Sequence, residues 1–138
     1  MKIYFWSSIS GGREYNEVYF IMIDYLKKFG KVLTEEVGDD KLIELTDRQL
    51  DDTKIYERDM KWLADSDIAI AEVSIPSLGV GYELANIEKM RKRHLCLYNQ
   101  QSAKRLSSMI NGNKFFNIKN YGNLEEALSH IGEFMKHL

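Results

Sequence analysis

The chain has little of several things that would place it in a specialised class of protein. It contains one cysteine among 138 residues, so no disulfide can form within it. Its 19 basic residues do not outnumber its 21 acidic ones, and the net charge of −2 gives no footprint for a nucleic acid. No apolar run approaches membrane-spanning length, and the N-terminal run is too short for a signal peptide. These absences favour a cytoplasmic protein and leave small anionic ligands open as partners.

Cysteine and histidine are too sparse to indicate a metal centre. Cys96 lies in an apolar run, so we expect it to be a reduced thiol in the core. No cluster of cysteine and histidine has the spacing of metal ligands. His94, His130 and His137 form no Ser/His/Asp arrangement, and we expect them to be structural or solvated. The length favours one domain spanning residues 1–138.

The chain does contain a regular alternation of short apolar runs and helix-like periodicity. The apolar runs predict strands at Ile3–Trp6, Lys31–Thr34, Ile68–Val73, Leu95–Tyr98 and Phe115–Ile118. The periodicity predicts helices at Tyr15–Phe29, Asp52–Ala64, Gly79–Arg93, Ala103–Ile110 and Leu124–Leu138. We therefore predict an α/β fold: a five-stranded parallel sheet with helices on both faces and the flavodoxin-like, Rossmann-like strand order 2-1-3-4-5.

Such a sheet binds ligands beyond the carboxyl ends of its strands, where the first and third strands lie side by side. The loop Ser-Ser-Ile-Ser-Gly-Gly-Arg at residues 7–13 and the loop after Val73 would meet there. Their hydroxyls, flexible backbone and guanidinium suit a phosphate or a sugar hydroxyl. Neither loop has the ending of a Walker motif. The Gly79–Gly81 segment lacks the third glycine of a dinucleotide fingerprint and follows the wrong strand.

Two carboxylates and a tyrosine are candidates for chemistry at this edge. Glu83 follows two glycines, and the first turn of a helix would keep it ionised, as a nucleophile needs; it is otherwise a helix N-terminal acid. Asp59 lies at the border of a buried helix stripe, where it either enters the site or pairs with a basic neighbour. Tyr4 either belongs to the core or orients Glu83. Glycosyl transfer uses two carboxyl groups, one at the anomeric carbon and one at the leaving group.

These residues together resemble the nucleoside 2-deoxyribosyltransferase superfamily, and within it the 2'-deoxynucleoside 5'-monophosphate N-glycosidases. The resemblance covers nearly the whole chain. It rests on Tyr4-Phe5, Ser8-Ile9, Gly11–Glu14, Gly30–Glu35, Glu57–Asp59, Trp62-Leu63, Ala71–Val73, Pro76–Leu84, Leu95–Leu97, Gln101-Ser102 and Leu106-Ser107. The Pro76–Leu84 block, in register with Asp59 and Tyr4, is its most specific part.

The resemblance implies cleavage of the N-glycosidic bond of deoxynucleotides to free base and 2-deoxyribose 5-phosphate, without metal or organic cofactor. It assigns the nucleophile to Glu83, the catalytic aspartate to Asp59 and the orienting tyrosine to Tyr4. It also implies a homodimer in which Ser107 reaches the neighbouring site. With the loop residues, the expected phosphate and sugar contacts are Ser8, Ser10, Gly11, Gly12, Arg13, Ser77, Gly79 and Ser107.

Two positions depart from the family pattern. The glycine before the loop serine is Ser7 here, and a loop position that is often arginine is Ser10. A lost cation weakens phosphate binding, since charge-assisted hydrogen bonds are about twice as strong as neutral ones, although Arg13 can compensate. For the base, we expect apolar walls that include Ile9, Ile43 and Leu45.

Two other functions stay open on the sequence alone. A deoxyribosyltransferase would use the same covalent step and pass the sugar to a second base. A non-catalytic nucleotide-binding module would use the same fold without turnover. Replacing Glu83 with alanine separates the two, because an enzyme loses turnover while keeping much of its ligand affinity and a module has no turnover to lose.

Overall fold

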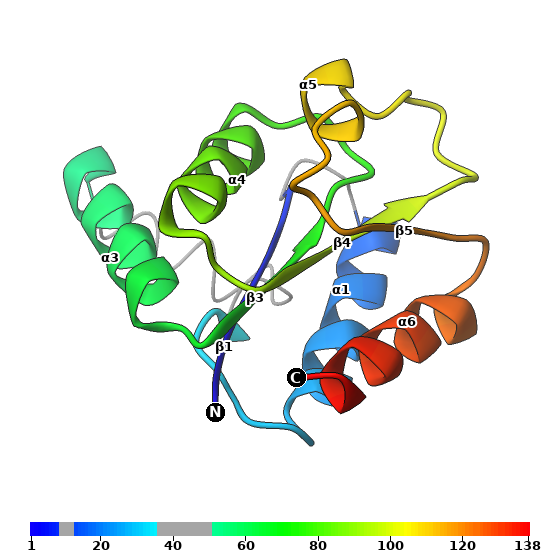
Figure 1. Ribbon diagram of the computed structural model, residues 1–138, viewed down its shortest axis with the longest axis horizontal. Coiled ribbons are helices and arrows are strands. Elements are labelled where there is room, and N and C mark those ends of the chain that lie inside the picture. Colours follow the sequence, from blue (N-terminus) through cyan, green and yellow to red (C-terminus); the bar gives the residue numbers. More distant parts are fainter. Residues whose placement is uncertain (9–12, 36–50) are drawn as a thin grey trace.

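The computed structural model describes residues 1–8, 13–35 and 51–138 (Figure 1). Five parallel strands form its sheet in the order β2-β1-β3-β4-β5, as predicted. Their bounds are β1 (Lys2–Ser7), β2 (Lys31–Val32), β3 (Ile68–Glu72), β4 (His94–Asn99) and β5 (Ile118–Tyr121). The reversal of strand order falls between β1 and β3, which brings the carboxyl ends of these two strands together.

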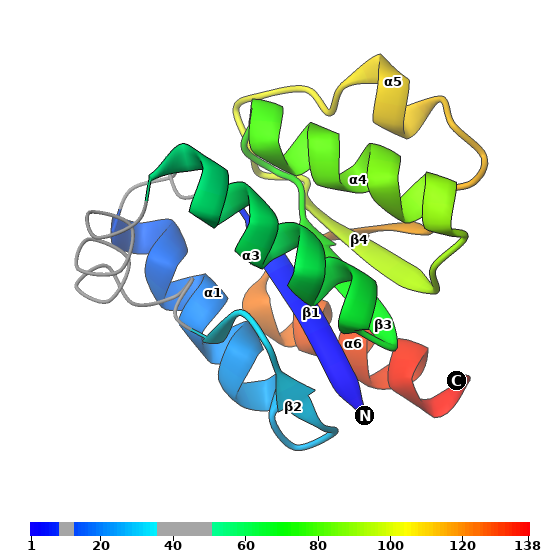
Figure 2. The same cartoon turned by 90° about the vertical axis from the view of Figure 1, so that its left-hand side faces the viewer.

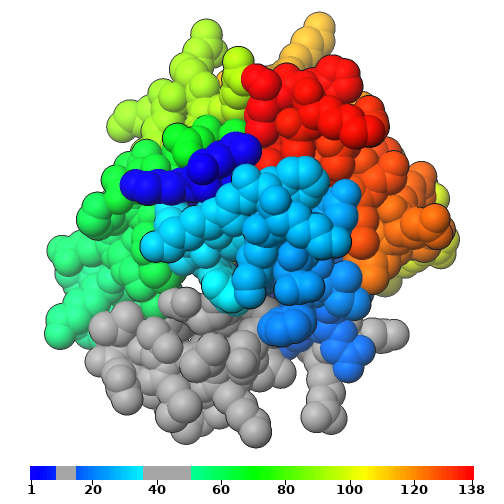
Figure 3. Space-filling model, turned by 90° about the horizontal axis from the view of Figure 1, so that it is seen from below, coloured from blue at the N-terminus to red at the C-terminus, as the bar shows by residue number. Residues whose placement is uncertain are grey.

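Helices cover both faces of the sheet. Their bounds are α1 (Arg13–Leu26), α3 (Asp52–Asp65), α4 (Leu78–Met90), α5 (Ser108–Asn111) and α6 (Leu124–Lys136). Helices α1 and α6 pack together on one face, and α3 and α4 lie side by side on the other (Figure 2). Both chain termini lie at the end of the molecule opposite the carboxyl ends of the strands, where the start of β1 approaches the end of α6 (Figure 3). None of the helices in the described ranges is long and apolar enough to cross a bilayer.

Strand alternation divides the core into two layers. Phe5 and Ile70 face α1 and α6, where they pack with Tyr19 and other apolar side chains. Tyr4 and Trp6 point the other way and pack with the apolar residues of α3 and α4. Because successive side chains of a strand point to opposite faces, Tyr4 is committed to the α3–α4 side. Its direction, left open by the sequence, is thereby resolved.

Strand β2 is shorter than predicted because a side chain takes over its pairing with β1. Regular β2 ends at Val32, and Leu33 N–H still donates to Ile3 O at 2.9 Å. Beyond it, the Thr34 hydroxyl accepts from Phe5 N–H at 3.1 Å and donates to Phe5 O. Thr34 thus replaces one step of the ladder. From position 36 to position 50, the predicted connection that follows lies outside the residues that the structure describes.

The region around α5 and β5 is displaced along the chain from its prediction. Helix α5 starts at Ser108 rather than Ala103, and β5 starts at Ile118 rather than Phe115. The Phe115 ring stacks on the His94 ring at a centroid distance of 4.7 Å, and Phe116 packs edge-on against both. Phe115 and Phe116, whose aromatic pair predicts a strand, therefore pack against His94 before β5 begins.

The cysteine and the histidines behave as structural residues. Cys96 is fully buried, and burial raises the pKa of its thiol to about 12, so it stays protonated. His94 is buried, with Nδ1 at 2.9 Å from Lys92 O and Nε2 accepting from Asn117 N–H at 3.1 Å. The half-buried His130 and the exposed His137 contact the backbone carbonyls of Asn120 and Glu133, respectively.

Candidate active site

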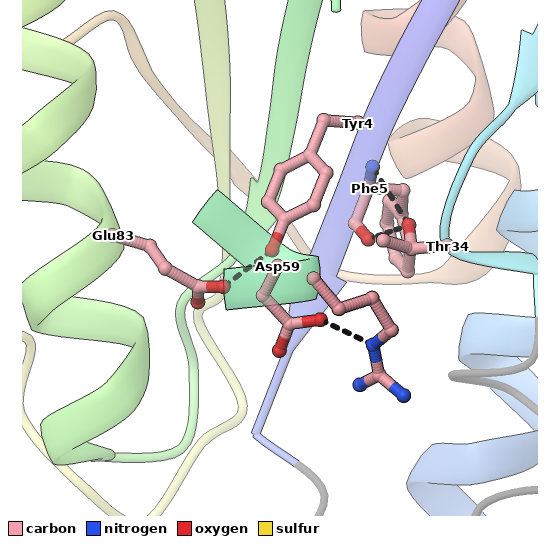
Figure 4. Close-up of polar contacts among 6 residues, drawn as sticks. Tyr4, Phe5, Thr34, Asp59 and Glu83 are labelled. Carbon is pink, nitrogen blue, oxygen red and sulfur yellow. Dashed lines mark hydrogen bonds and ion pairs between the residues drawn. The ribbon is translucent and has the colours of Figure 1, made fainter. Parts of the chain in front are cut away.

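The centre of the candidate site is a hydrogen bond between β1 and α4. The Tyr4 hydroxyl donates to Glu83 Oε1 at 2.5 Å (Figure 4). Tyr4 is 1 % exposed, and its ring packs against the Trp6 ring at a centroid distance of 5.2 Å. Burial, together with the charge of Glu83, raises the pKa of Tyr4 far above its usual value. The tyrosine is therefore a permanent donor that holds one carboxylate oxygen in place.

Glu83 lies deeper in its helix than the sequence indicated. Helix α4 begins at Leu78 with Ser77 as N-cap, which makes Glu83 its sixth residue and puts it in the second turn. The prediction that the first turn keeps Glu83 ionised is therefore wrong. Burial instead raises its pKa to about 7; the Tyr4 hydrogen bond opposes this rise, and the charge of Asp59 adds to it. The carboxylate changes its protonation state near neutral pH.

Asp59 approaches the same point from α3. Its side chain is 28 % exposed, and its Oδ1 accepts from Arg58 Nε at 2.9 Å. The Arg58 guanidinium lies over the Trp62 ring, 4.9 Å from its centroid. Asp59 lies beside the Tyr4–Glu83 pair in Figure 4, and its charge contributes to the raised pKa of both residues. The expected pairing of Asp59 with a basic neighbour is confirmed, and its part in the chemistry stays a prediction.

The predicted phosphate serines also cap helices. The Ser77 hydroxyl oxygen accepts from Val80 N–H at 3.3 Å at the start of α4, and Ser107 accepts from Met109 N–H at 3.3 Å at the start of α5. As caps they use an acceptor lone pair, which leaves each hydroxyl proton available to an anion. Both serines line a cavity of about 650 Å³ between α4 and the α5 region.

This cavity is separate from the carboxylate pair. Its lining includes Ser77 and Ser107 but none of Tyr4, Asp59 and Glu83. Within one chain, the predicted site residues that the structure describes thus fall into two groups. These two serines line the cavity, and Tyr4, Asp59 and Glu83 lie outside it. Ser8 is buried directly after β1, at the carboxyl edge of the sheet.

Glycine is not required by packing at the two glycines of α4. A Cβ at Gly79 would be 3.8 Å from Ser77 Oγ, an ordinary contact, and one at Gly81 would meet nothing within 4 Å. Gly79 is moreover inside the first turn of α4 rather than in a loop. Helical glycine costs up to about 1 kcal/mol relative to alanine. Open space therefore lies beside the first turns of α4.

Several predicted contacts fall where the structure gives no description. Ile9, Ser10, Gly11, Gly12, Ile43 and Leu45 lie outside the described residues, and only the backbone of Arg13, at the start of α1, is described. Within the described part of the chain, no group of three or more His, Cys, Asp or Glu side chains is placed to hold a metal ion.

Sequence reasoning missed two residues that support the site. Thr34 fastens the backbone of Phe5, next to Tyr4, and Trp6 packs on the Tyr4 ring. Trp6 was detectable from its spacing of two residues from Tyr4 on the same strand. Thr34 gave no signal, because its role arises only when β2 ends and its hydroxyl replaces a backbone contact.

Comparison with known proteins places this geometry in a family. The family model for nucleoside 2-deoxyribosyltransferase matches residues 3–123. The chain belongs to the nucleoside 2-deoxyribosyltransferase family. A Nematostella vectensis relative, provisionally named 2'-deoxynucleoside 5'-phosphate N-hydrolase 1, is 50 % identical over 128 residues, covering 87 % of this chain and 84 % of the relative.

Other members of the family carry a more specific name. The 5-hydroxymethyl-dUMP N-hydrolase of Esox lucius is 43 % identical over 143 residues, covering 100 % of this chain and 98 % of the relative. Among solved structures, the Clostridium botulinum CMP N-glycosidase BcmB superposes with a TM-score of 0.69 at 14 % identity, covering 97 % of this family member and 99 % of that chain. At such low identity the likeness confirms the α/β fold.

Replacing Glu83 by glutamine is expected to stabilise this family member at alkaline pH. Because the pKa of Glu83 is about 7 in the folded protein and 4.5 ordinarily, the unfolded chain gives up this proton first as pH rises. Stability is therefore lost between about pH 4.5 and about pH 7, and Glu83→Gln removes that loss. Thermal unfolding is expected to show a higher Tm for the variant at about pH 8 and little difference at about pH 5.

Glu88→Gln is the matched control, because it removes an equal charge from the same helix without touching Tyr4. Its effect on Tm is expected to be the same at both pH values. A gain for Glu83→Gln that is equal at both pH values would contradict a half-buried carboxylate that binds a proton near neutral pH.

Proposed function

We propose that this protein hydrolyses the N-glycosidic bond of 2'-deoxynucleoside 5'-monophosphates, releasing the base and 2-deoxyribose 5-phosphate. The observation that carries the proposal is the Tyr4–Glu83 hydrogen bond, with the charge of Asp59 acting on both residues. The names of the two relatives described above, both N-hydrolases of deoxynucleotides, support hydrolysis as the reaction. The enzyme is an N-glycosidase in this proposal.

In the proposed mechanism Glu83 attacks C1' of the deoxyribose while the bond to the base breaks. Asp59 protonates or hydrogen-bonds the departing base, and Tyr4 holds the Glu83 carboxylate oriented toward C1'. A water molecule then hydrolyses the glycosyl ester, so that two inversions give net retention and Glu83 is regenerated. The missing 2'-hydroxyl makes the oxocarbenium-like transition state easier to reach, which accounts for a deoxyribose preference.

The 5'-phosphate is proposed to bind where α4 begins. Ser77 contributes a hydroxyl proton, and the N-terminus of α4 favours a negative charge. Ser8, Ser107 and the glycine loop that leads to Arg13 are the further contacts that the family resemblance implies. Donors of this kind favour a nucleotide over its nucleoside.

A homodimer is proposed to complete the site. Leu78 on α4 is 96 % exposed and Met109 on α5 is 80 % exposed, so two large apolar side chains flank the cavity that Ser77 and Ser107 line. The open space at Gly81 would let a second copy approach α4 closely. Ser107 of one cytoplasmic subunit would then serve the site of the other.

The transferase alternative follows from the name of the family model. In that reaction a free base, rather than water, would take the deoxyribosyl group from Glu83. The serine-rich surroundings of the site argue for a phosphorylated substrate, whereas transferases of this family tend to recognise an unphosphorylated 5'-hydroxyl. Hydrolysis is therefore the leading proposal.

A substrate panel tests the reaction and the phosphate preference together. Deoxynucleoside 5'-monophosphates, including 5-hydroxymethyl-dUMP, are expected to release base with kcat/KM about tenfold or more above that of the matching nucleosides. Chromatography of the products measures the release. No release from any nucleotide at high enzyme concentration would refute the hydrolase, and a new nucleoside on adding free base would favour the transferase. Loss of turnover with retained ligand binding in Glu83→Ala would exclude a non-catalytic module.

Removing the Tyr4 hydroxyl is expected to move the acid limb of the kcat/KM profile to higher pH. The Tyr4 hydrogen bond lowers the pKa of Glu83, so Tyr4→Phe raises that pKa and fewer enzyme molecules carry an ionised nucleophile at neutral pH. A hydrogen bond to a charged group is worth about 1.5–3 kcal/mol, or about one to two pH units. The acid limb of kcat/KM against pH is the measurement. Tyr25→Phe, on α1, is the control expected to leave it unchanged, and an unmoved limb in Tyr4→Phe would contradict the assignment.

Replacing Asp59 by asparagine is expected to move the same limb downward while slowing the reaction. The charge of Asp59 raises the pKa of Glu83, so its loss lowers that pKa. Loss of leaving-group assistance is expected to reduce kcat by about 10²–10⁴-fold. Asp65→Asn is the control on the same helix, because Asp65 pairs with Lys61 on the surface at 2.5 Å. If Asp59→Asn retained full kcat, Asp59 would have no part in the chemistry.

A further inference from the structure

A second carboxylate, Glu72, is buried where β3 ends. Its side chain is 0 % exposed and lies on the α1–α6 face of the sheet, opposite to Tyr4. Its Oε2 accepts from the Tyr19 hydroxyl at 3.0 Å. Its Oε1 accepts from the Tyr121 hydroxyl at 3.3 Å, from Ser74 N–H at 3.2 Å and from the Ser74 hydroxyl. A buried carboxylate is costly unless hydrogen bonds compensate it, and four neutral donors do so here.

Glu72 fastens the first residue of the segment that leads to α4. Ser74 is 1 % exposed and is bound from two further directions: its hydroxyl oxygen accepts from Asn99 N–H at 2.7 Å, and its carbonyl accepts from Ser102 Oγ at 3.1 Å. Three residues later Ser77 caps α4, the helix that carries Glu83. The segment that leads to α4 is thus hydrogen-bonded to a network on the α1–α6 face of the sheet.

A carboxylate fits the donors that this network presents. All four groups around Glu72 donate, and an ionised carboxyl group accepts at both ends and donates at neither. A glutamine would turn an N–H₂ group toward a hydroxyl and force that hydroxyl to accept instead of donate. An apolar residue, such as Ile70 on the same strand, would leave the hydroxyls of Tyr19 and Tyr121 buried without this acceptor.

We propose that Glu72 is a positioning residue of the active site: through Ser74 it holds the segment that bears Ser77 and the start of α4, without touching the substrate. Its kinetic consequence rests on the proposed hydrolase function. Its structural consequence, a firmly held 74–81 segment, does not.

The kinetic test compares Glu72→Gln, Ser74→Ala and the double variant. Each single change is expected to raise KM for a deoxynucleoside 5'-monophosphate about tenfold, the effect of one lost hydrogen bond to a charge. We expect kcat to fall less, because Tyr4 still holds Glu83. The double variant is expected to raise KM by less than the product of the two single effects, since both changes remove the bond between Glu72 and the Ser74 hydroxyl. Additive effects would overturn the proposal.

Tyr19→Phe is the matched control. It removes a hydroxyl from Oε2 and leaves the Ser74 contacts on Oε1 intact. This variant is expected to lose thermal stability and keep the wild-type KM. If Glu72→Gln and Tyr19→Phe lowered Tm and raised KM in the same proportion, Glu72 would be a purely structural residue.

Hydrogen exchange of the backbone amides tests positioning independently of turnover. In Glu72→Gln, amides of residues 74–81 are expected to exchange at least about tenfold faster, while those of α6 keep their rates. Ser74→Ala is expected to give the same local pattern, which keeps the test decisive if Glu72→Gln fails to fold. Uniformly faster exchange would overturn the proposal. If the wild-type protein releases no base while the two variants show this local pattern, the hydrolase function is refuted and the positioning role stands.

Discussion

The hydrogen bond from Tyr4 to Glu83 is the interaction on which the candidate site depends, because it joins the interior of the sheet to the helix that carries the proposed nucleophile. Strand β1 is flanked by β2 and β3, and Thr34 fastens its backbone beside Tyr4. The tyrosine is therefore held by one of the most constrained segments of the fold. Glu83 gains a fixed direction from this bond, and its pKa results from a balance in which burial outweighs the tyrosine.

Much of this arrangement is predictable from sequence, because alternation of strands and helices dictates which loops meet at the carboxyl edge. The meeting of Tyr4, Asp59 and Glu83 follows from that topology together with the family resemblance. The direction of Tyr4 does not, since both faces of β1 are buried and carry no polar alternation. The protonation of Glu83 was mispredicted because it is governed by burial in the second turn of α4, which no local pattern reports. Phe115 reads as a strand residue because aromatic runs favour strands, yet its partner is the distant ring of His94.

The two faces of the sheet divide the work of holding α4. On one face, Glu83 is anchored to Tyr4; on the other, Glu72 anchors the residue from which the connection to α4 departs. Burial raises the pKa of both carboxyl groups, so keeping each of them ionised inside the fold costs stability, which their hydrogen bonds offset in part. Such sites of local instability concentrate where a protein binds and reacts, and stability is commonly exchanged for activity there.

The environment of Tyr4 also bears on the alkaline side of the enzyme's working range. Because burial and the nearby carboxylate keep its phenol protonated far beyond the usual range, this tyrosine cannot act as a base and does not become an anion beside Glu83. A phenolate there would repel the carboxylate and destroy its alignment. Tyr4 therefore keeps its proton at high pH. Any fall in rate under alkaline conditions must come from a different group, on the substrate or elsewhere on the protein.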